Sequence, residues 1–341
     1  MRSRTVWQRH LNDLPGFELV GVQDPATEAL GKAVDDGLVK EEQTFTELDA
    51  MLESVSPDAL IACPIIAAHA GAVEAGLAAG CHVLVEKPFT DDLAAAVRLA
   101  ERAADAGRVL AVVQNWRTKS VGAALKEAID EGAIGAVGQV FFRYLRDREA
   151  PHLPSYLFDE QDPILWGMSI HHFDLFRFAL GQDIARVAGH AKNAPWSRYS
   201  TPSTLQLWME TTGGIPISYV ATFSSHNAHL PLESLQVEGE LGTLYNESAY
   251  SEPPLLLSLR GAGEPVDVTA DIAERDQQAQ YRIGDVALLT NFGEAVRGRA
   301  EAIAPASENL GTLAAIEAAR RAVREGTTVE VADLLPSSTR V

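Results

Sequence analysis

Short apolar runs alternate with longer amphipathic stretches through the first third of the chain. Strand-like apolar runs cover residues 17–25, 58–64, 81–85 and 109–114, and helix-like stretches cover residues 67–79 and 91–106. Alternation of buried strands with helices is typical of a parallel sheet with right-handed crossovers. The pattern therefore predicts a Rossmann-type dinucleotide-binding domain over residues 1–117.

The pattern changes after residue 117. A helix over residues 121–131 leads into long strands over residues 137–144, 185–191, 204–211, 215–224, 233–238 and 243–246. Uninterrupted strands indicate an open sheet, mainly antiparallel or mixed, with helices on one face. We therefore expect an α+β domain over residues 118–341. The alternation of Leu205, Leu207 and Met209 indicates one buried face of its sheet.

A Glu-Lys-Pro turn follows the apolar strand that ends at Val85. In open α/β sheets, ligands bind at the carboxyl ends of parallel strands. Charged residues are excluded from a strand buried on both faces, so Glu86 and Lys87 mark the point where the chain leaves the core. Taken alone, the tripeptide favours a surface turn closed by Pro88. Its place in the β-α-β-α series instead favours a lysine directed at a ligand.

These residues, in this order, resemble the glucose-fructose oxidoreductase / inositol dehydrogenase / rhizopine-catabolism (Gfo/Idh/MocA) family. The resemblance covers nearly the whole chain. Its motifs are Glu18-Leu19-Val20 with Asp24, Pro64 with His69, Gly80 through Pro88, Arg117, Gly132 to Val140, His171 with Asp174 and Gly181, and Ala306 to Val331. A Glu-Lys-Pro turn and a later His-x-x-Asp helix at the expected separation argue against coincidence.

The resemblance implies hydride transfer between a nicotinamide cofactor and a hydroxyl or carbonyl of a sugar, cyclitol or related polyol. Oxidation of an alcohol needs a group that accepts the hydroxyl proton, and histidine titrates near neutral pH. Helical register favours His171 as the acid/base, with His172 as the other candidate and packing as the favoured role of His172. Lys87 is expected to stabilise the developing alkoxide.

Asp24 carries the cofactor preference, because a carboxylate after this strand binds the ribose 2′-hydroxyl and repels a 2′-phosphate. We therefore expect NAD, with NADP less favoured. Asp24 also has the right type and position to cap the next helix, and one residue can do both. The resemblance extends the predicted cofactor site to Cys63, Pro64, His69, Glu86, Lys87 and Asn115.

The predicted substrate contacts lie farther along the chain. The resemblance implies roles for Arg117, just after the last Rossmann strand, and for Asp174. Tyr156 and Trp166 are of the types that contact sugars by stacking and hydrogen bonding. For either aromatic residue, a plain surface or loop position is the alternative.

The amino terminus departs from the family pattern. The family begins with a strand and a Gly-rich turn, and the segment Met1 to Thr5 starts about where that turn would end. We therefore expect the first, central strand of the sheet to be missing, which leaves a gap of roughly two strand spacings. A start assigned too far downstream and a true truncation are the two explanations, and the intact hydrophobic pattern of the remainder favours the first.

A second departure lies before the motif histidine. Many family members carry an acid four residues ahead of it, and this chain has Gly167 there. An acid at that spacing would hold the imidazole, so its loss removes one orienting partner. Two rival functions stay open, and the departure at Gly167 supports the first of them. One is a non-catalytic regulatory relative that binds cofactor or sugar, and the other is a redox-neutral enzyme that processes glycosides with NAD.

The net charge and the cysteine content disfavour several classes of binding partner. The 341 residues carry a formal net charge of −19, which disfavours nucleic acid and anionic membranes as partners. The two cysteines and the histidines show no metal-ligand spacing, so we expect no metal site. Reduced thiols fit a cytoplasmic protein. The resemblance further implies a homo-oligomer formed through the C-terminal sheet.

Overall fold

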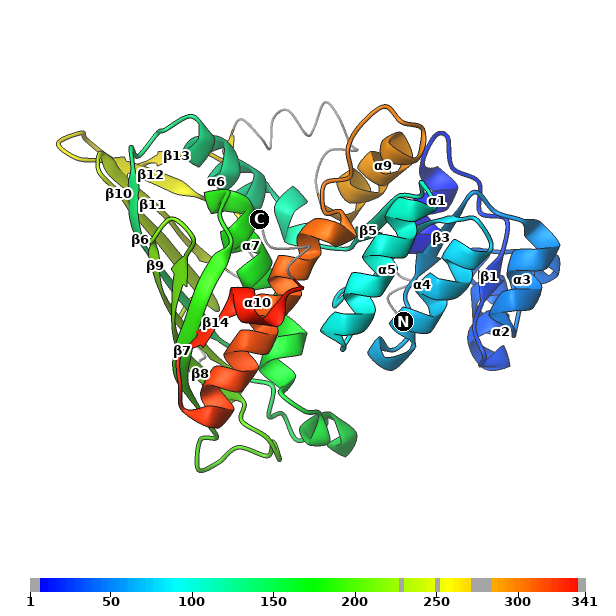
Figure 1. The fold of residues 1–341 in the computed structure, drawn as a ribbon, viewed down its shortest axis with the longest axis horizontal. Coiled ribbons are helices and arrows are strands. Elements are labelled where there is room, and N and C mark those ends of the chain that lie inside the picture. Colours follow the sequence, from blue (N-terminus) through cyan, green and yellow to red (C-terminus); the bar gives the residue numbers. More distant parts are fainter. Residues whose placement is uncertain (1–6, 227–229, 249–251, 271–283, 337–341) are drawn as a thin grey trace. The chain divides into compact units, whose positions relative to one another are not determined.

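The computed structural model describes residues 7–226, 230–248, 252–270 and 284–336. The chain divides into two compact units. The first contains Met1–Gln114 and Asp285–Leu310, and the second contains Asn115–Gly284 and Gly311–Val341. Figure 1 labels their helices and strands.

The first unit carries two parallel sheets. Strands β1 (Val22–Gln23) and β2 (Thr44–Phe45) pair with each other, and β3 (Ala59–Ala62), β4 (His82–Val85) and β5 (Leu110–Val112) form a sheet in the order β3-β4-β5. The helices between them are α1 (Gln8–Asp13), α2 (Thr27–Asp35), α3 (Leu48–Val55), α4 (His69–Ala78) and α5 (Leu93–Asp105). Strand β4 is apolar and buried along most of its length, as expected of a strand covered on both faces. The predicted Rossmann-type alternation is confirmed.

The strand expected over residues 17–25 is much shorter in the structure. Only Val22 and Gln23 pair with a neighbouring strand, and that neighbour is β2. Among the described residues, no strand joins β1 and β2 to the β3-β4-β5 sheet. The missing first strand and Gly-rich turn stay a prediction, because residues 1–6 lie outside the described ranges.

One segment from late in the sequence belongs to the first unit rather than to the domain expected over residues 118–341. Helix α9 (Gly284–Val296) packs closely enough that a Cβ added at Gly293 would lie 2.5 Å from the Phe17 ring. The carbonyl of Ala304 accepts a hydrogen bond of 2.9 Å from the Val112 N–H, and Pro305 forms a bridge with Ala111. The segment around Ala304 therefore pairs with the open edge of β5. No local sequence pattern predicts this pairing.

The second unit is built on a nine-stranded sheet with the order β13-β12-β11-β10-β6-β9-β8-β7-β14. The strands are β6 (Val137–Leu145), β7 (Ile184–Lys192), β8 (Thr204–Thr211), β9 (Pro216–Thr222), β10 (Glu233–Gly239), β11 (Gly242–Ser248), β12 (Leu256–Leu259), β13 (Val266–Asp267) and β14 (Val329–Glu330). All neighbours are antiparallel except β6 and β9, which are parallel. The predicted open, mainly antiparallel sheet is therefore confirmed.

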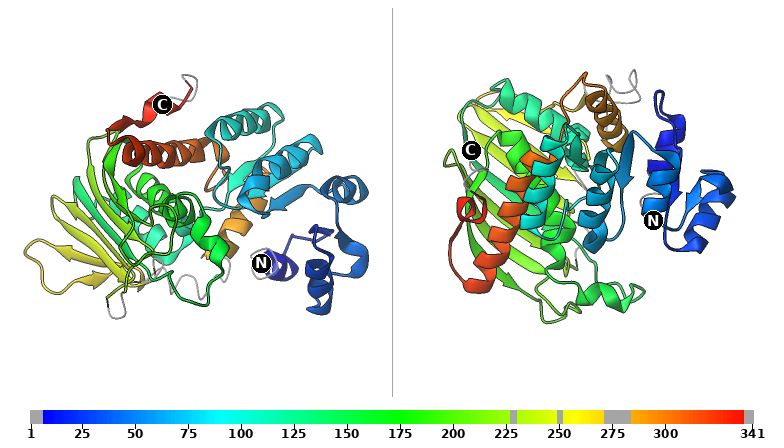
Figure 2. Two further views of the ribbon diagram at one scale, coloured as in Figure 1. Left: turned by 90° about the horizontal axis from the view of Figure 1, so that it is seen from below. Right: turned by 45° about the vertical axis from the view of Figure 1, so that its right-hand side comes forward.

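Helices cover one face of this sheet. Figures 1 and 2 show α7 (Ile170–Leu180) and α10 (Ala306–Glu325) along the same face, and α6 (Ser120–Asp130) packs on α7. Leu205, Leu207 and Met209 of β8 are buried, whereas Trp208 between them is 40% exposed. The predicted alternation is confirmed, because successive strand residues point to opposite faces. No helix in the described ranges is long and apolar enough to cross a membrane.

Helix α6 makes one very close backbone contact. A Cβ added at Gly122 would lie 1.9 Å from the carbonyl oxygen of Trp116, which belongs to the short 3-10 helix Asn115–Thr118. Only glycine permits this approach, so Gly122 determines how the helix that carries Trp116 lies on α6.

We predict that Gly122→Ala lowers the free energy of unfolding by at least about 2 kcal/mol, because the added methyl collides with backbone that cannot rotate away. The matched control is Gly71→Ala in α4, where a Cβ meets no atom within 4 Å. The control should be neutral or stabilise the protein by up to about 1 kcal/mol through helix propensity. Urea unfolding of both variants measures the difference, and equal effects would contradict the steric argument.

Candidate functional site

The first candidate site lies at the carboxyl end of β4. Glu86 is only 5% exposed and accepts a hydrogen bond of 3.2 Å from the indole Nε1 of Trp7. Lys87 follows it and is half-buried, so its side chain keeps access to solvent. Trp7 itself is 1% exposed. The turn is therefore held by a buried acid, while the lysine remains accessible to a ligand.

His69 supports the same turn from α4. Its Nδ1 lies 2.7 Å from the carbonyl oxygen of Pro88, and its Nε2 lies 3.3 Å from the carbonyl oxygen of Pro64. The imidazole is 1% exposed, so both ring nitrogens face backbone carbonyls within the unit. His69 therefore links the turns that follow β3 and β4, and any effect on a cofactor would act through the positions of those turns.

The other predicted cofactor residues of the first unit lie at strand ends. The Asp24 carboxylate, just after β1, accepts a hydrogen bond of 2.9 Å from the Ala26 N–H. It thereby supports the start of α2, and it remains half-exposed. Cys63 follows β3 and is half-buried, and Pro64 is exposed. The N-cap of α2 is Ala26, and no side chain caps it, so Asp24 stabilises the turn just before the helix and is not its cap. Its contact with ribose stays a prediction.

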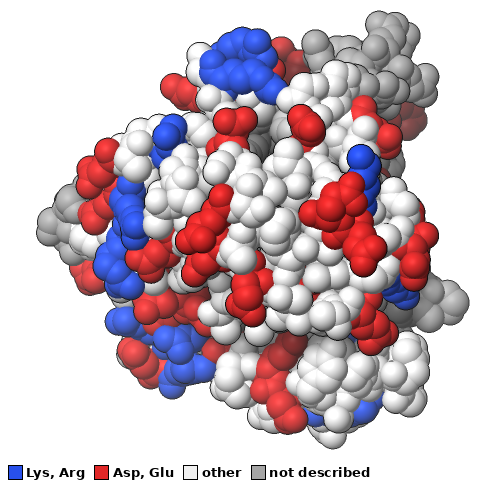
Figure 3. Space-filling view, turned by 90° about the vertical axis from the view of Figure 1, so that its right-hand side faces the viewer, with Lys and Arg blue, Asp and Glu red and all other residues white. Residues whose placement is uncertain are grey.

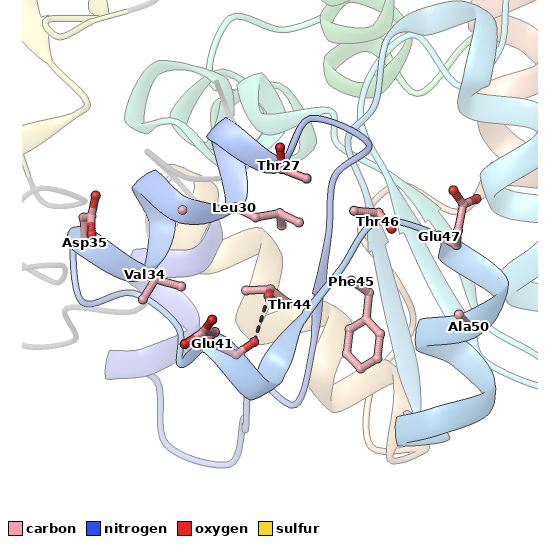
Figure 4. Close-up of a pocket in the computed structure, with 11 residues that line it drawn as sticks. Thr27, Leu30, Val34, Asp35, Glu41, Thr44, Phe45, Thr46, Glu47 and Ala50 are labelled. Carbon is pink, nitrogen blue, oxygen red and sulfur yellow. Dashed lines mark hydrogen bonds between the residues drawn. The ribbon is translucent and has the colours of Figure 1, made fainter.

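A cavity of about 640 Å³ lies elsewhere in the first unit, between α2, β2 and α3 (Figure 4). Leu30, Val34 and Phe45 supply apolar lining. The charged residues of the lining are all acids: Asp35, Glu41 and Glu47. None of the predicted site residues lines this cavity, and its negative charge is unsuited to a pyrophosphate.

Figure 3 shows acidic side chains spread widely over one face of the molecule, in keeping with the net charge of −19.

The second candidate site is centred on His171 at the start of α7. Its imidazole stacks on the indole of Trp116, with ring centroids 5.4 Å apart and an angle of 8° between the planes. His171 is 8% exposed, so the residue lies almost entirely inside the unit. A π-helical turn, Leu165–Ser169, precedes it and contains Gly167. Such turns are rare and are often found at functional sites.

His172 also packs against Trp116, with ring centroids 5.0 Å apart and an angle of 53° between the planes. It is fully buried, and its Nδ1 lies 2.8 Å from the Tyr219 hydroxyl, which in turn lies 2.7 Å from the Ser169 hydroxyl. Phe142 and Tyr144 pack against its ring, with centroids 4.5 and 5.1 Å away. Burial raises the pKa of the Tyr219 phenol, so the hydroxyl stays protonated and donates a hydrogen bond. The environment of His172 is that of a core residue.

Arg117 and Asp174, both predicted to contact substrate, form a buried ion pair within the second unit. The guanidinium Nε and Nη2 donate to the two carboxylate oxygens at 2.7 and 2.8 Å, and each side chain is 1% exposed. The Thr312 hydroxyl of α10 also donates to the carboxylate at 3.0 Å. The sequence analysis missed this pairing, because 57 residues separate the partners.

The remaining predicted residues are scattered over the second unit. Asn115 opens the 3-10 helix that carries Trp116 and is half-buried. Tyr156 is 67% exposed on the 3-10 helix Ser155–Asp159, whereas Trp166 is half-buried in the π-helical turn. Sequence reasoning did not single out Ser169, Tyr219 or Trp116 for the surroundings of the histidines. Within the described residues, no cluster of three or more His, Cys, Asp or Glu side chains suits a metal ion.

The arrangement matches the chemistry of alcohol oxidation. In the first unit a lysine stands at the carboxyl end of a parallel strand, where an ammonium can stabilise a developing alkoxide. In the second unit the His171 imidazole stacks on the Trp116 indole, and an imidazole is a group that can act as an acid/base.

Comparisons with known proteins agree over most of the chain. A family profile described as "Oxidoreductase family, NAD-binding Rossmann fold" matches residues 3–114, and its companion, "Oxidoreductase family, C-terminal alpha/beta domain", matches residues 126–331. The D-apiose dehydrogenase of Paraburkholderia graminis is 27% identical over 94% of this chain and 85% of its own length. The scyllo-inositol 2-dehydrogenase (NAD(+)) of Bacillus subtilis is 27% identical over 84% of this chain and 81% of its own length.

A solved structure shows the same fold. The crystal structure of an oxidoreductase from Agrobacterium radiobacter in complex with NAD+, L-tartaric acid and magnesium superposes with a TM-score of 0.83. It is 19% identical and covers 96% of this chain and 95% of its own. With both family profiles matched in order, the chain belongs to the Gfo/Idh/MocA family of oxidoreductases.

Proposed function

We propose that this protein is an NAD-dependent oxidoreductase that transfers a hydride between nicotinamide and a CH–OH group of a sugar, cyclitol or related polyol. The observation that carries the proposal is the Glu86-Lys87-Pro88 turn, with its acid buried against Trp7 and its lysine accessible. Relatives that match over most of the chain are named as dehydrogenases of D-apiose and scyllo-inositol. Family membership supplies the cofactor class.

In this proposal Lys87 binds the reacting oxygen and stabilises its negative charge as the hydride leaves. His171 accepts the hydroxyl proton in oxidation and returns it in reduction. His172 keeps a structural role, because its ring is fully buried and hydrogen-bonded to Tyr219. The nicotinamide cofactor, when bound, supplies the hydride acceptor.

Supporting roles follow from the contacts within each unit. Glu86 orients the turn that carries Lys87, and His69 holds the turns at Pro64 and Pro88. The buried Arg117–Asp174 pair positions Trp116, the platform of His171, rather than touching substrate itself. Cys63 and Asn115 remain proposed cofactor contacts, and Tyr156 and Trp166 remain proposed substrate contacts.

We further propose that the protein is cytoplasmic and forms a homo-oligomer. The face of the nine-stranded sheet opposite the helices exposes large apolar side chains, including 40% of Phe141 and 40% of Trp208. Exposed apolar patches of this kind mark association surfaces. A symmetric pairing of two such faces would bury them.

Gly167 favours one rival, a regulatory relative that binds cofactor or sugar without turnover. An acid one helical turn before His171 would orient the imidazole, and glycine cannot. The stacking of Trp116 on His171 supplies another means of orientation, so we retain the enzyme as the proposed function. Stoichiometric NADH release from NAD separates the two, because a regulator produces none and a redox-neutral enzyme recycles it.

The first prediction concerns the two catalytic residues. Lys87→Met and His171→Ala should each lower kcat by about 100- to 10,000-fold, because each removes a group that acts only on the developing charge or proton. The assay is NADH formation from NAD with a panel that contains scyllo-inositol and D-apiose. His172→Ala is the matched control, and it should lower the melting temperature while retaining far more of kcat than His171→Ala. Loss of kcat in a stable His172→Ala variant, with His171→Ala active, would reverse the assignment.

The second prediction concerns the cofactor. Asp24→Asn keeps an oxygen that can accept the Ala26 N–H and removes the negative charge. We expect the ratio of kcat/KM for NAD to that for NADP to fall by about 10- to 100-fold, since repulsion of the 2′-phosphate is lost. The ratio is measured with saturating substrate and each cofactor in turn. An unchanged ratio would mean that Asp24 only supports the start of α2.

A further inference from the structure

Arg148 carries a guanidinium for which the described part of the chain supplies no ion pair and no hydrogen bond. The residue lies just after β6, where its backbone N–H donates to the Phe223 carbonyl at 2.8 Å. Its guanidinium carbon lies 4.8 Å from the centroid of the Phe223 ring, and the side chain is half-buried. A cation that has lost part of its water, packs on an aromatic face and forms no ion pair with the described residues favours an anion nearby.

The guanidinium lies beside Gly167, one turn before His171. A Cβ added at Gly167 would contact the Phe223 ring at 3.5 Å and would lie 4.0 Å from Nη1 of Arg148. An acidic side chain at position 167 would therefore reach Arg148 and neutralise it. Glycine at this position leaves the Arg148 guanidinium available to bind a ligand. Gly167 is four residues before His171, the proposed base.

The acids near Arg148 do not take this role. The Glu149 carboxylate accepts hydrogen bonds from the hydroxyls of Ser224 at 2.6 Å and Ser197 at 2.8 Å, and from the Arg198 N–H at 2.8 Å. Partial burial raises the pKa of the Glu160 carboxyl, an effect that Arg148 opposes without forming an ion pair. The surroundings thus leave a guanidinium with its donor groups open to a ligand.

We propose that Arg148 binds a carboxylate on the substrate, so that the alcohol oxidised by this enzyme belongs to a sugar acid. The inference rests on the proposed function and names its substrate class. The planar guanidinium donates two parallel N–H bonds, which match the two oxygens of a carboxylate. A single guanidinium suits one negative charge, whereas a phosphate dianion usually draws on several cations.

In this arrangement the carboxylate is a binding group and undergoes no chemistry. The hydride leaves the carbon of the alcohol for the nicotinamide, and the hydroxyl proton goes to His171, as in the proposed function. Arg148 sets specificity, because a neutral sugar of the same size leaves the guanidinium without its partner.

The test compares matched substrates with the full chain and NAD. D-glucuronate is paired with D-glucose, D-galacturonate with D-galactose and D-gluconate with D-glucitol, and scyllo-inositol and D-glucose 6-phosphate complete the panel. We expect kcat/KM for at least one acid to exceed that of its neutral partner by about 10- to 100-fold, the usual value of a charge-assisted contact. Arg148→Gln should remove most of this preference by raising KM for the acid, with a much smaller effect on the neutral partner.

Two variants at position 167 sharpen the result. Gly167→Asp places a carboxylate beside Arg148 and should lower kcat/KM for the sugar acid by about 10-fold or more. Gly167→Asn adds a side chain of the same shape without the charge, and it should lower kcat/KM much less. Preference for a neutral sugar or for D-glucose 6-phosphate, or an equal loss on both members of a pair in Arg148→Gln, would overturn the inference and leave the proposed function standing. No NADH from any compound would count against the proposed function, and the inference would fail with it.

Discussion

The buried ion pair between Arg117 and Asp174 is the constraint on which the second unit depends. Both side chains are 1% exposed, and the Thr312 hydroxyl adds a third hydrogen bond. The pair ties the 3-10 helix after β5, helix α7 and helix α10 together at one point. Loss of either partner would leave an uncompensated buried charge, which costs about 3–5 kcal/mol. Because Trp116 precedes Arg117 and His171 lies one turn from Asp174, the same pair also determines how the indole stacks on the proposed base.

In the first unit, hydrogen bonds rather than an ion pair hold the turn that carries Lys87. A lysine that is to act on a ligand must stand at the end of a buried strand, where the backbone is rigid. Glu86 is held by the indole of Trp7, and His69 spans the carbonyl oxygens of Pro64 and Pro88. Buried polar groups need partners of this kind, because an unpaired one costs about 1–3 kcal/mol. Each unit thus buries the polar groups that hold the side chain for which we propose a catalytic role.

The two adjacent histidines of α7 have different surroundings because they point in different directions from the helix axis. His171 and His172 occupy neighbouring positions on α7, about 100° apart around the helix axis. Both rings pack against Trp116, but His171 stacks parallel to the indole, whereas His172 is tilted to it and lies 2.8 Å from the Tyr219 hydroxyl. The chain departs from the family's acid at Gly167, and the nearest charged group to that position is a cation, Arg148. Family membership accordingly defines the reaction class, and the proposal that Arg148 selects the substrate rests on this local replacement.

The sequence by itself determined the α/β alternation, the strand-rich second part, the Glu86-Lys87-Pro88 turn and the His171 helix. Each depends on periodicity or on neighbours within a few residues, which is information that the chain carries locally. Only the tertiary structure decided that residues 285–310 join the first unit and that Arg117 pairs with Asp174. Both contacts join segments that are distant in the sequence. An open strand edge has unpaired backbone N–H and C=O groups, and a buried charge needs an opposite charge, but only the folded chain determines which segment supplies the partner.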